Sequence, residues 1–369
     1  MEKRTEAQAY HHPGPAPLVK RVDPAHTSSL KIWYHNKIEN IKLKGAFCVA
    51  AIAVVGSLNM DLVIRAPRQP HLGETLLGGA FGMTGGGKGA NQALACARLS
   101  AGVHMIGCVG SDDFGRKLRA TLTENRVDCD HLEERSEAGT GVAVVTVLDG
   151  GANAIVLSQG ANAFLDEAAL DRAKDVFKKV DSALFQLEIP PETVAYGLKL
   201  ARRMGCRTFL SAEPPFPLPS EVWHMVDCLI LNQAALDFYG PRHANGEAIS
   251  EDQLEDRITD LAQQLVARGV KTVVVTRSAR GGLVFSRGGK SFAFNSFCVQ
   301  AVDSTGARDA FCAALSVGMA EGMPLERAVR FAAAAGALAC TRFGAQSSMP
   351  WRHEVEAMLE AQGEEETQP

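Results

Sequence analysis

The stretch AVDSTGARDAF, residues 301–311, is a turn of small residues that opens directly into an apolar helical pattern, Ala310–Glu321. Free backbone N–H groups at such a helix start bind anions, and Asp309 lies beside them. Phosphoryl transfer needs this combination, because the N–H groups stabilise the charge of the moving phosphate and a carboxylate takes the proton of the attacking hydroxyl. A residue that only favours the helix dipole would fit the same position, so the segment alone leaves both interpretations open.

Outward from this segment, short β-rich runs alternate with amphipathic helical stretches. The predicted strands are Ala50–Val55, His104–Val109, Ala183–Gln186, Thr208–Ser211, Cys228–Leu231 and Thr272–Thr276. The predicted helices are Ala90–Leu99, Phe114–Asn125, Asp166–Phe177, Pro191–Met204, Gln253–Ala267, Ala310–Glu321 and Leu325–Cys340. This alternation predicts an α/β fold in which helices cover both faces of a mostly parallel sheet.

Two pairs of short runs break the alternation and are predicted to be β-hairpins. The first joins Asp61–Ala66 to Leu76–Phe81, and the second joins Gly141–Leu148 to Asn153–Leu157. Together they would build a small β lid over the ends of the parallel strands.

Composition excludes several classes of protein. The formal net charge of −4 over 369 residues gives no broad basic surface, so nucleic acid and anionic membranes are poor candidates as partners. Nine cysteines without a CxxC pair indicate a reducing compartment, with neither a disulfide scaffold nor a zinc site. The apolar run Ala46–Val55 is too short to span a bilayer and is expected to be the first buried strand. A cytoplasmic enzyme is therefore expected.

The two ends of the chain differ from its middle. Residues 1–45 show neither a helical nor a strand period, and we interpret them as a disordered extension or a misassigned start. Residues 362–369 form a polar tail. A single domain is predicted over residues 46–361, with its lid at about 57–83 and 140–158.

The glycine cluster GMTGGGKGAN, residues 82–91, nearly satisfies the Walker pattern, but Gly89 stands where the Mg²⁺-binding hydroxyl would be. Taken alone, the cluster is compatible both with a tight turn before a helix and with a turn that contacts a ligand. Asn59 and Asp61 follow the first strand, at the sheet edge where open α/β folds bind ligands. With Lys88 and Asn91 they would offer donors and acceptors to a polyhydroxylated ligand. A turn-satisfying Asn59 and a solvated Asp61 remain the alternative.

These segments together carry a resemblance to the ribokinases of the PfkB carbohydrate-kinase family, over about Ile52 to Leu359. The matching motifs are GSLNMD (56–61), GGKGANQ (86–92), QLE (186–188), the turn 303–309 and GAQSSMPW (344–351). The resemblance implies a ribokinase-like three-layer α/β/α sandwich with a β-hairpin lid. It also implies an enzyme that uses ATP and Mg²⁺, with K⁺ as activator, to phosphorylate a small sugar, D-ribose first, and a homodimer formed through the lid.

The resemblance also assigns roles to individual positions. Asp309 would be the general base, and it would bind the sugar together with Asn59, Asp61, Gly87, Lys88, Asn91 and Glu188. The nucleotide would lie against Asn232, Thr276, Ser278, Gly281, Gly306, Ala307, Arg308 and Ala333. A monovalent cation would bind at Asp303, Thr305, Gly344 and Ser348.

Four positions depart from the family pattern. Arg308 replaces a glycine next to the base, Ser278 replaces a glycine near the phosphates, and Ala235 replaces a carboxylate that helps to organise Mg²⁺ through water. Ala333 occupies a place where a polar residue often borders the adenine. If the family glycine needs a positive φ, Arg308 strains the turn; alternatively, its guanidinium stabilises the transferring phosphate.

Three functions are compatible with this sequence. The first is an ATP-dependent ribokinase, the second a kinase for another sugar or a nucleoside, and the third a catalytically impaired sugar-binding paralogue. A nicotinamide dehydrogenase is set aside, because no G-x-G-x-x-G follows the first strand.

Overall fold

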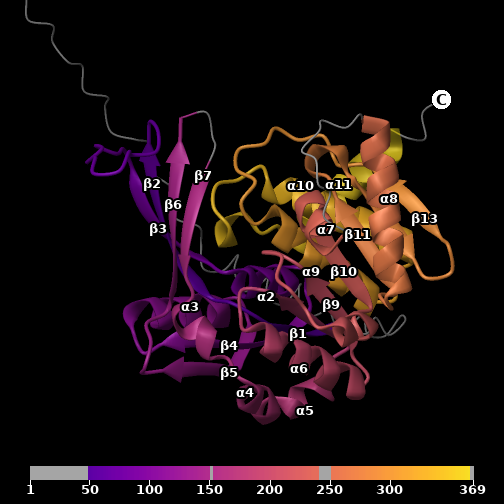
Figure 1. The fold of residues 1–369 in the computed structure, drawn as a ribbon, viewed down its shortest axis with the longest axis horizontal. Helices are drawn as coiled ribbons and strands as arrows, with labels where there is room; N and C mark the ends of the chain where they lie inside the picture. The colour runs from indigo at the N-terminus through magenta and orange to yellow at the C-terminus, as the bar shows by residue number, and fades with distance from the viewer. Residues whose placement is uncertain (1–48, 150–152, 241–250, 366–369) are drawn as a thin grey trace, which may run out of the picture. The chain divides into compact units, whose positions relative to one another are not determined.

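The computed structural model describes residues 49–149, 153–240 and 251–365 (Figure 1). The predictions for residues 1–45 lie outside the described residues, as does the end of the polar tail from residue 366. Within the described part of the chain, no helix combines the length and the hydrophobicity needed to cross a bilayer.

The main sheet has nine strands, and the predicted parallel arrangement is confirmed over most of it. Their order is β13 (Ser291–Phe294), β12 (Gly282–Ser286), β11 (Thr272–Thr276), β10 (Cys228–Asn232), β9 (Arg207–Ser211), β8 (Ser182–Gln186), β1 (Ala51–Val55), β4 (Gly102–Gly110) and β5 (Val127–Arg135). Neighbours from β11 to β5 are parallel, whereas β12 and β13 fold back as antiparallel strands at one edge. The carboxyl ends of the parallel strands therefore share one edge of the sheet.

Helices cover both faces of this sheet, which gives the predicted three-layer α/β/α sandwich. The helices are α2 (Lys88–Arg98), α3 (Asp113–Glu124), α4 (Glu167–Arg172), α5 (Lys174–Phe177), α6 (Pro191–Arg203), α7 (Gln233–Tyr239), α8 (Glu251–Ala267), α9 (Ala307–Ala320), α10 (Leu325–Ala339) and α11 (Arg352–Glu365). Alternate residues of β1 point into different cores: Ile52 and Val54 pack with α2, α9 and α10, while Ala53 and Val55 pack with α4 to α8. Burial on both faces explains why β1 is a continuous apolar run.

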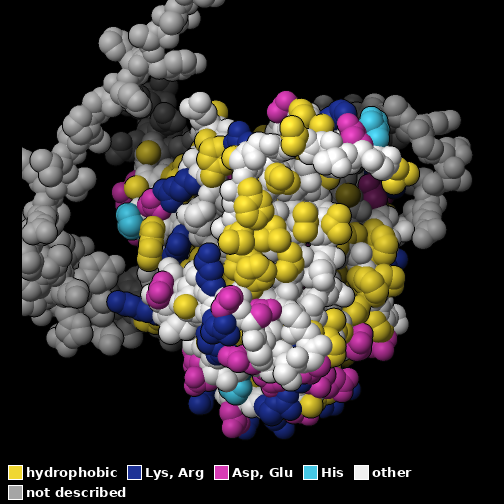
Figure 2. Space-filling model, turned by 90° about the vertical axis from the view of Figure 1, so that its left-hand side faces the viewer, with side chains coloured by type: hydrophobic (Ala, Val, Ile, Leu, Met, Phe, Trp, Pro, Cys, Tyr) yellow, Lys and Arg dark blue, Asp and Glu magenta, His cyan; other side chains and the backbone are white. Residues whose placement is uncertain are grey.

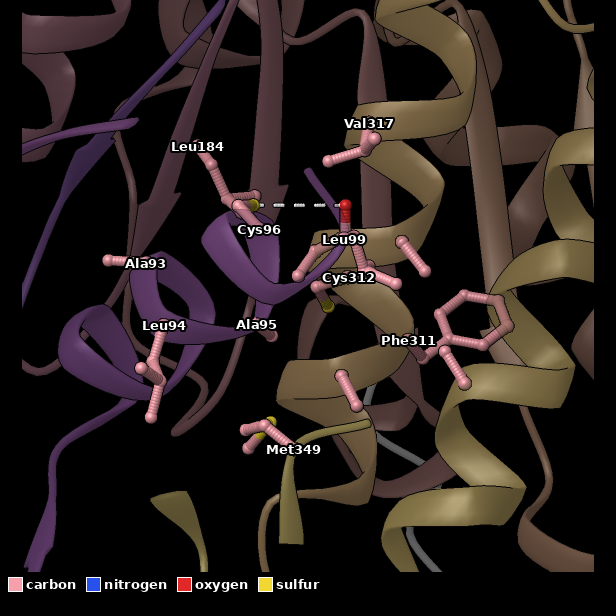
Figure 3. Packing of buried hydrophobic residues seen from close by; sticks show 14 of the residues in the cluster. Ala93, Leu94, Ala95, Cys96, Leu99, Leu184, Phe311, Cys312, Val317 and Met349 are labelled. Carbon is pink, nitrogen blue, oxygen red and sulfur yellow. Dashed lines mark hydrogen bonds between the residues drawn. The ribbon is translucent and has the colours of Figure 1, made fainter. Parts of the chain in front are cut away.

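Small residues let α9 approach its neighbours closely. In Figure 3, Cys96 and Leu99 of α2 lie beside Cys312 of α9, and the Cys96 Sγ lies 3.9 Å from the backbone oxygen of Ala313. All of these side chains are fully buried. The helix that begins at the 301–311 turn is therefore fixed in the core along most of its length, which holds its N-terminus in place.

The lid is one four-stranded sheet in place of two separate hairpins. Its order is β3 (Phe81–Gly86), β2 (Asn59–Ala66), β6 (Gly141–Leu148) and β7 (Asn153–Ser158), with β2 and β6 parallel in the centre. The predicted strand Leu76–Phe81 is wrong, because the strand begins where that segment was expected to end. Residues 82–86 of the glycine cluster are thus strand, and its turn is confined to Gly87, directly before α2.

Other departures from the predicted elements are local. The predicted helix Asp166–Phe177 is two short helices, α4 and α5, that meet at Ala173. The strands β5, β12 and β13 were not predicted at all. β5 and β13 are the two edge strands, which are half exposed and have a weak hydrophobic pattern. β12, next to β13, is largely buried but only five residues long.

Candidate active site

Asp309 lies between the residues predicted to bind the sugar, the predicted sugar side, and those predicted to bind the nucleotide. It is in the first turn of α9 and only 7% exposed. Asn91 Nδ2 donates to its Oδ2 and Gln92 Nε2 to its Oδ1, both at 2.9 Å. Burial raises the pKa of Asp309, and Lys88 and the two amides oppose this shift. A buried carboxylate held by two donors is well placed to accept a proton.

Gln92 was not predicted as a site residue, although it lies in a quoted motif. Its own orientation is set by Gln186, whose Nε2 donates to Gln92 Oε1 at 2.6 Å. The amide that donates to Asp309 is therefore fixed by a second amide from β8. In a helix sequence an amide like this is indistinguishable from an exposed polar residue, so only the packing identifies it.

Glu188 is the centre of the sugar side. Lys88 Nζ lies 2.6 Å from its Oε1, and Ser57 Oγ donates to its Oε2 at 2.6 Å. Asn59 Nδ2 approaches the same Oε2 at 3.5 Å. The structure therefore brings together the predicted residues Asn59, Lys88 and Glu188, and adds Ser57, which the sequence motif contained without a role.

Asn162 is a further residue that was not predicted. It lies in the short 3-10 helix η1 (Gly160–Phe164) and is fully buried. Its Nδ2 donates to Asn59 Oδ1 at 2.8 Å and to the Leu58 oxygen at 3.0 Å, while its Oδ1 accepts from the Leu58 N–H at 2.9 Å. Asn162 thereby fixes the turn between β1 and β2 and the direction of the Asn59 amide.

Two glycines make room for this arrangement. Gly87 has φ +86°, and a Cβ there would lie 2.6 Å from the Asn59 backbone nitrogen. A Cβ at Gly86 would lie 2.2 Å from Asp61 Oδ2. The glycine cluster is therefore needed for close approach, which places Lys88 and the start of α2 against the turn after β1.

Asp61 extends the sugar side onto the lid, because it lies on β2 opposite Thr84 of β3. Burial raises its pKa to about 7, with a further increase from Glu188 and Asp309 and a decrease from Lys88. For Lys88 itself burial lowers the pKa, but Glu188 and Asp309 outweigh it and the net pKa is raised. The site thus combines a firmly protonated amine with a carboxyl group that titrates near neutral pH.

A cavity of about 670 Å³ adjoins Asp309 on the side of β11 and α10. Of the predicted nucleotide residues, it is lined by Thr276, Ser278, Gly281, Gly306, Ala307, Arg308 and Ala333. Its lining also includes residues that were not predicted, among them Ser211, Glu213, Phe294 and Cys298. The α10 residues Ala333, Gly336, Ala337 and Cys340 form one stripe along it, at helical spacing.

Asn232 is not among the residues that line this cavity. Its Oδ1 accepts from the Ala235 N–H at 2.8 Å and so caps α7, while its backbone is in register with Thr276. Ala235 is fully buried. Ala235 stands where the family pattern has a carboxylate. The first turn of α7 carries no other acidic side chain that could take its place.

The predicted strain at Arg308 is wrong. The positive φ of the turn belongs to Gly306, at +79°, which is the residue immediately before α9. Arg308 lies inside the first helical turn, where any residue is tolerated, and its guanidinium forms an ion pair with Glu213. The backbone at Arg308 is therefore not strained.

Backbone strain is found instead at Ser278, whose φ is +54°. Such a conformation costs a non-glycine residue about 1 kcal/mol. We expect Ser278→Gly to raise the free energy of unfolding by about 1 kcal/mol, measured by urea denaturation. Ser278→Ala is the matched control, because it removes the hydroxyl and keeps the strain. Equal changes for the two variants would show that the conformation is not the cause.

The predicted cation residues lie on two loops that Asp303 joins. Its Oδ1 accepts from Thr305 N at 2.9 Å and Oγ1 at 2.6 Å, and its Oδ2 accepts from Gly344 N at 2.9 Å. Burial raises the pKa of Asp303, but these hydrogen bonds outweigh it and the net pKa is lowered. Ser348, in η4 (Gln346–Ser348), donates to the Ala345 oxygen at 2.8 Å. An ionised carboxylate thus links both loops.

Comparison with known proteins agrees with this geometry. Residues 49–352 match the model of the pfkB family carbohydrate kinases. The ribokinase of Bacillus subtilis is 38% identical over 308 residues, which are 84% of this chain and 99% of that protein. The ribokinase of Haemophilus influenzae is 34% identical over 309 residues, 84% of this chain and 98% of that protein. The structure of Arabidopsis thaliana ribokinase complexed with ribose and ATP aligns with a TM-score of 0.75 at 30% identity, covering 84% of this chain and 99% of that chain.

Proposed function

The chain belongs to the pfkB family of carbohydrate kinases, and on that premise we propose that it transfers the γ-phosphate of ATP to the primary hydroxyl of D-ribose, giving D-ribose 5-phosphate. The observation that carries this proposal is the position of Asp309. It lies between a cluster of sugar-binding groups around Glu188 and a cavity large enough for a nucleotide.

In the proposed reaction, the oxygen of the sugar hydroxyl bonds to the γ-phosphorus of ATP while the bond to the bridging β–γ oxygen breaks. The hydroxyl proton goes to Asp309, and ADP leaves. The negative charge on the moving phosphoryl group is stabilised by the N–H groups at the start of α9, after Gly306.

Unpaired acceptors support a polyhydroxylated substrate. Asn91 is 5% exposed, and no group among the described residues donates a hydrogen bond to its buried Oδ1. An acceptor buried without a donor costs about 1–3 kcal/mol. A hydroxyl group of a bound sugar would satisfy it, which gives Asn91 a place on the sugar side as well as at Asp309.

We propose that Mg²⁺ enters with ATP. This ion usually keeps several waters and takes most of its other ligands from substrate phosphates, and it would neutralise charge on them. The protein itself offers few ligands for Mg²⁺ here, because Ala235 has no carboxylate and Asn232 Oδ1 already accepts a hydrogen bond as the cap of α7. The roles of Asp309 and the α9 N–H groups do not depend on it.

We also propose K⁺ at the loops joined by Asp303. Oxygen ligands suit such an ion, and Asp303, Thr305 and Ser348 each carry a side-chain oxygen there. A bound cation would stiffen the turn before α9 without contacting substrate.

A homodimer through the lid is proposed from its outer face. Met83, Leu62, Val144 and Val156 form one row across the four strands, on the face opposite Asp61. Val156 is 73% exposed and Phe81, two residues from Met83, is 61% exposed. Figure 2, which faces the lid side of the molecule, shows hydrophobic side chains gathered there. A second copy would cover them.

Val156→Asp is expected to shift the protein from dimer to monomer in sedimentation experiments, because a buried unpaired carboxylate destabilises an interface by several kcal/mol. Gln263→Asp, at an exposed position of α8 outside the lid, is the control for added charge. A parent protein that sediments as a monomer would contradict the proposed dimer.

One assay tests the proposed function: ADP release with MgATP and a panel of pentoses, hexoses and nucleosides, with K⁺ or Na⁺. Stimulation by D-ribose above all others supports a ribokinase. Stimulation by another sugar or a nucleoside supports the second candidate function. Sugar binding by calorimetry without ADP release would make the protein an impaired paralogue, which Ser278 and Ala235 favour.

A further inference from the structure

Two positively charged side chains face the cavity next to Asp309, and each forms an ion pair with a carboxylate. Lys88 pairs with Glu188 on the sugar side, and Arg308 pairs with Glu213 on the nucleotide side. All except Glu188 line the cavity itself. Arg308 is near enough to Lys88 to lower its pKa, so the two positive charges act on the same space.

Arg308 keeps hydrogen-bonding capacity that the protein does not use. A guanidinium has five N–H donors, and a carboxylate such as Glu213 engages only part of that set. The Nε of Arg308 is buried, and no acceptor for it is found among the residues that the structure describes. A buried unpaired donor next to a cavity indicates a ligand that carries acceptor oxygens.

We propose that Arg308 binds the β- and γ-phosphates of ATP and stabilises the phosphoryl group during transfer, and that Glu213 is a positioning residue that holds the guanidinium over the phosphates. This inference deepens the proposed kinase function and rests on it. It assigns a catalytic part to the residue that departs most from the family turn, and a role to Glu213, which nothing else in the site requires.

The geometry of α9 supports this assignment. Arg308 directly precedes Asp309 in the first helical turn, so its side chain starts beside both the proposed base and the N–H groups that bind the phosphate. The side chain is 34% exposed, and that of Glu213 is 14% exposed. A cation at this place is partly desolvated, where its attraction to a phosphate is stronger than at a solvated surface.

Glu213 also makes the proposal sharply testable. If Arg308 is removed, Glu213 becomes an unpaired carboxylate on the wall of the phosphate site and repels the phosphates. Removing both side chains relieves this repulsion. The double variant should therefore bind nucleotide phosphates more tightly than the single Arg308 variant does, an order that a merely structural ion pair would not produce.

The test is calorimetric binding of the non-hydrolysable analogue Mg·AMP-PNP and of AMP, together with kcat for sugar phosphorylation. Arg308→Ala is expected to weaken AMP-PNP binding about 10- to 100-fold and AMP binding less than about threefold. It should lower kcat about 10²-fold. Arg308→Lys restores charge without the planar fork and should recover only part of either loss. Arg308→Ala/Glu213→Ala should bind AMP-PNP several-fold more tightly than Arg308→Ala.

Arg327→Ala is the matched control, because Arg327 is an exposed arginine in the first turn of α10. It should leave both affinities and kcat within about twofold of the parent. Thermal melting of every variant separates loss of folding from loss of binding. Glu213→Gln, which keeps an acceptor for Arg308, should retain more kcat than Glu213→Ala.

Two results would overturn the proposal. One is an Arg308→Ala variant that binds AMP-PNP and turns over sugar within about twofold of the parent. The other is an equal loss of AMP and AMP-PNP affinity, which would place the contact away from the β- and γ-phosphates. A parent that binds AMP-PNP through Arg308 but phosphorylates no sugar would support the phosphate contact while rejecting the kinase function.

Discussion

Asp309→Asn is expected to lower kcat by about 10²- to 10⁴-fold while the sugar binds almost as tightly as before. The reason is chemical, since an amide keeps the size of the side chain but cannot accept the hydroxyl proton. Asn91 and Gln92, which now donate to the carboxylate, would also face an amide group with one acceptor less. Steady-state kinetics with ATP and D-ribose, paired with calorimetric titration of ribose, measures both quantities.

Asp113→Asn is the control for this prediction. Asp113 lies in the first turn of α3, so the substitution removes the same charge from an equivalent helix position outside the site. It should leave kcat within about twofold. Turnover of Asp309→Asn within a few-fold of the parent would remove Asp309 from the role of general base.

Asp61→Ala is expected to raise the KM for the sugar about 10- to 100-fold, with a much smaller effect on the KM for ATP. Asp61 lies on the lid strand β2, close to Glu188 and Asp309, which affect its pKa, and it is not itself among the residues that line the cavity on the side of β11 and α10. Charge-assisted hydrogen bonds from sugar hydroxyls to a carboxylate contribute about 1.5–3 kcal/mol, which gives this factor.

The pH dependence gives a second measurement on the same residue. With a pKa near 7, Asp61 is largely ionised at pH 8 and largely protonated at pH 6. The protonated form loses the charge-assisted bonds, so the KM of the parent for sugar should rise as the pH falls through 7. In Asp61→Ala this rise should disappear.

Asp130→Ala is the matched control for Asp61→Ala, because Asp130 is an exposed aspartate on the strand β5. Its KM for sugar and the pH profile should follow the parent. An unchanged sugar KM in Asp61→Ala would leave Asp61 a solvated lid residue with no contact to substrate.

The fold could be predicted from sequence where burial imposes a strong pattern. The apolar strand β11 and the amphipathic helix α8 were placed nearly to the residue, whereas the short helix α7 beside them was not predicted. β3 could not be placed, since its glycines are typical of a turn. The segment forms a strand by pairing with β2, and Gly85 and Gly86 are needed in it because Gln346 and Asp61 occupy the space that side chains would need. That information lies in distant segments.

The site residues likewise divide into those that the sequence could predict and those that it could not. Residues in contiguous motifs, such as Lys88, Glu188 and Asp309, were named from sequence. The structure brings them into two hydrogen-bonded groups, one around Glu188 and one around Asp309, that influence each other electrostatically. Asn162 and Glu213 were not named, because each is a lone polar residue whose importance depends on what folds against it. The possible strain at Arg308 is not found for a related reason: the helix begins at Ala307, three residues before its predicted start at Ala310, so the positive φ falls on Gly306.

The stripe of cavity residues on α10 has a consequence for how such a pocket changes in evolution. Ala333, Gly336, Ala337 and Cys340 border the cavity, whereas their neighbours Ala332, Ala334 and Ala335 are fully buried in the core. Larger side chains on the buried face would overpack the core and destabilise the protein by about 1–3 kcal/mol. At Ala333 and Ala337 they would extend into the cavity and make it shallower, whereas a Cβ at Gly336 would already lie 3.1 Å from the Ala307 backbone oxygen. The shape of this cavity can therefore drift by single substitutions on one side of this helix while selection for stability keeps the other side unchanged.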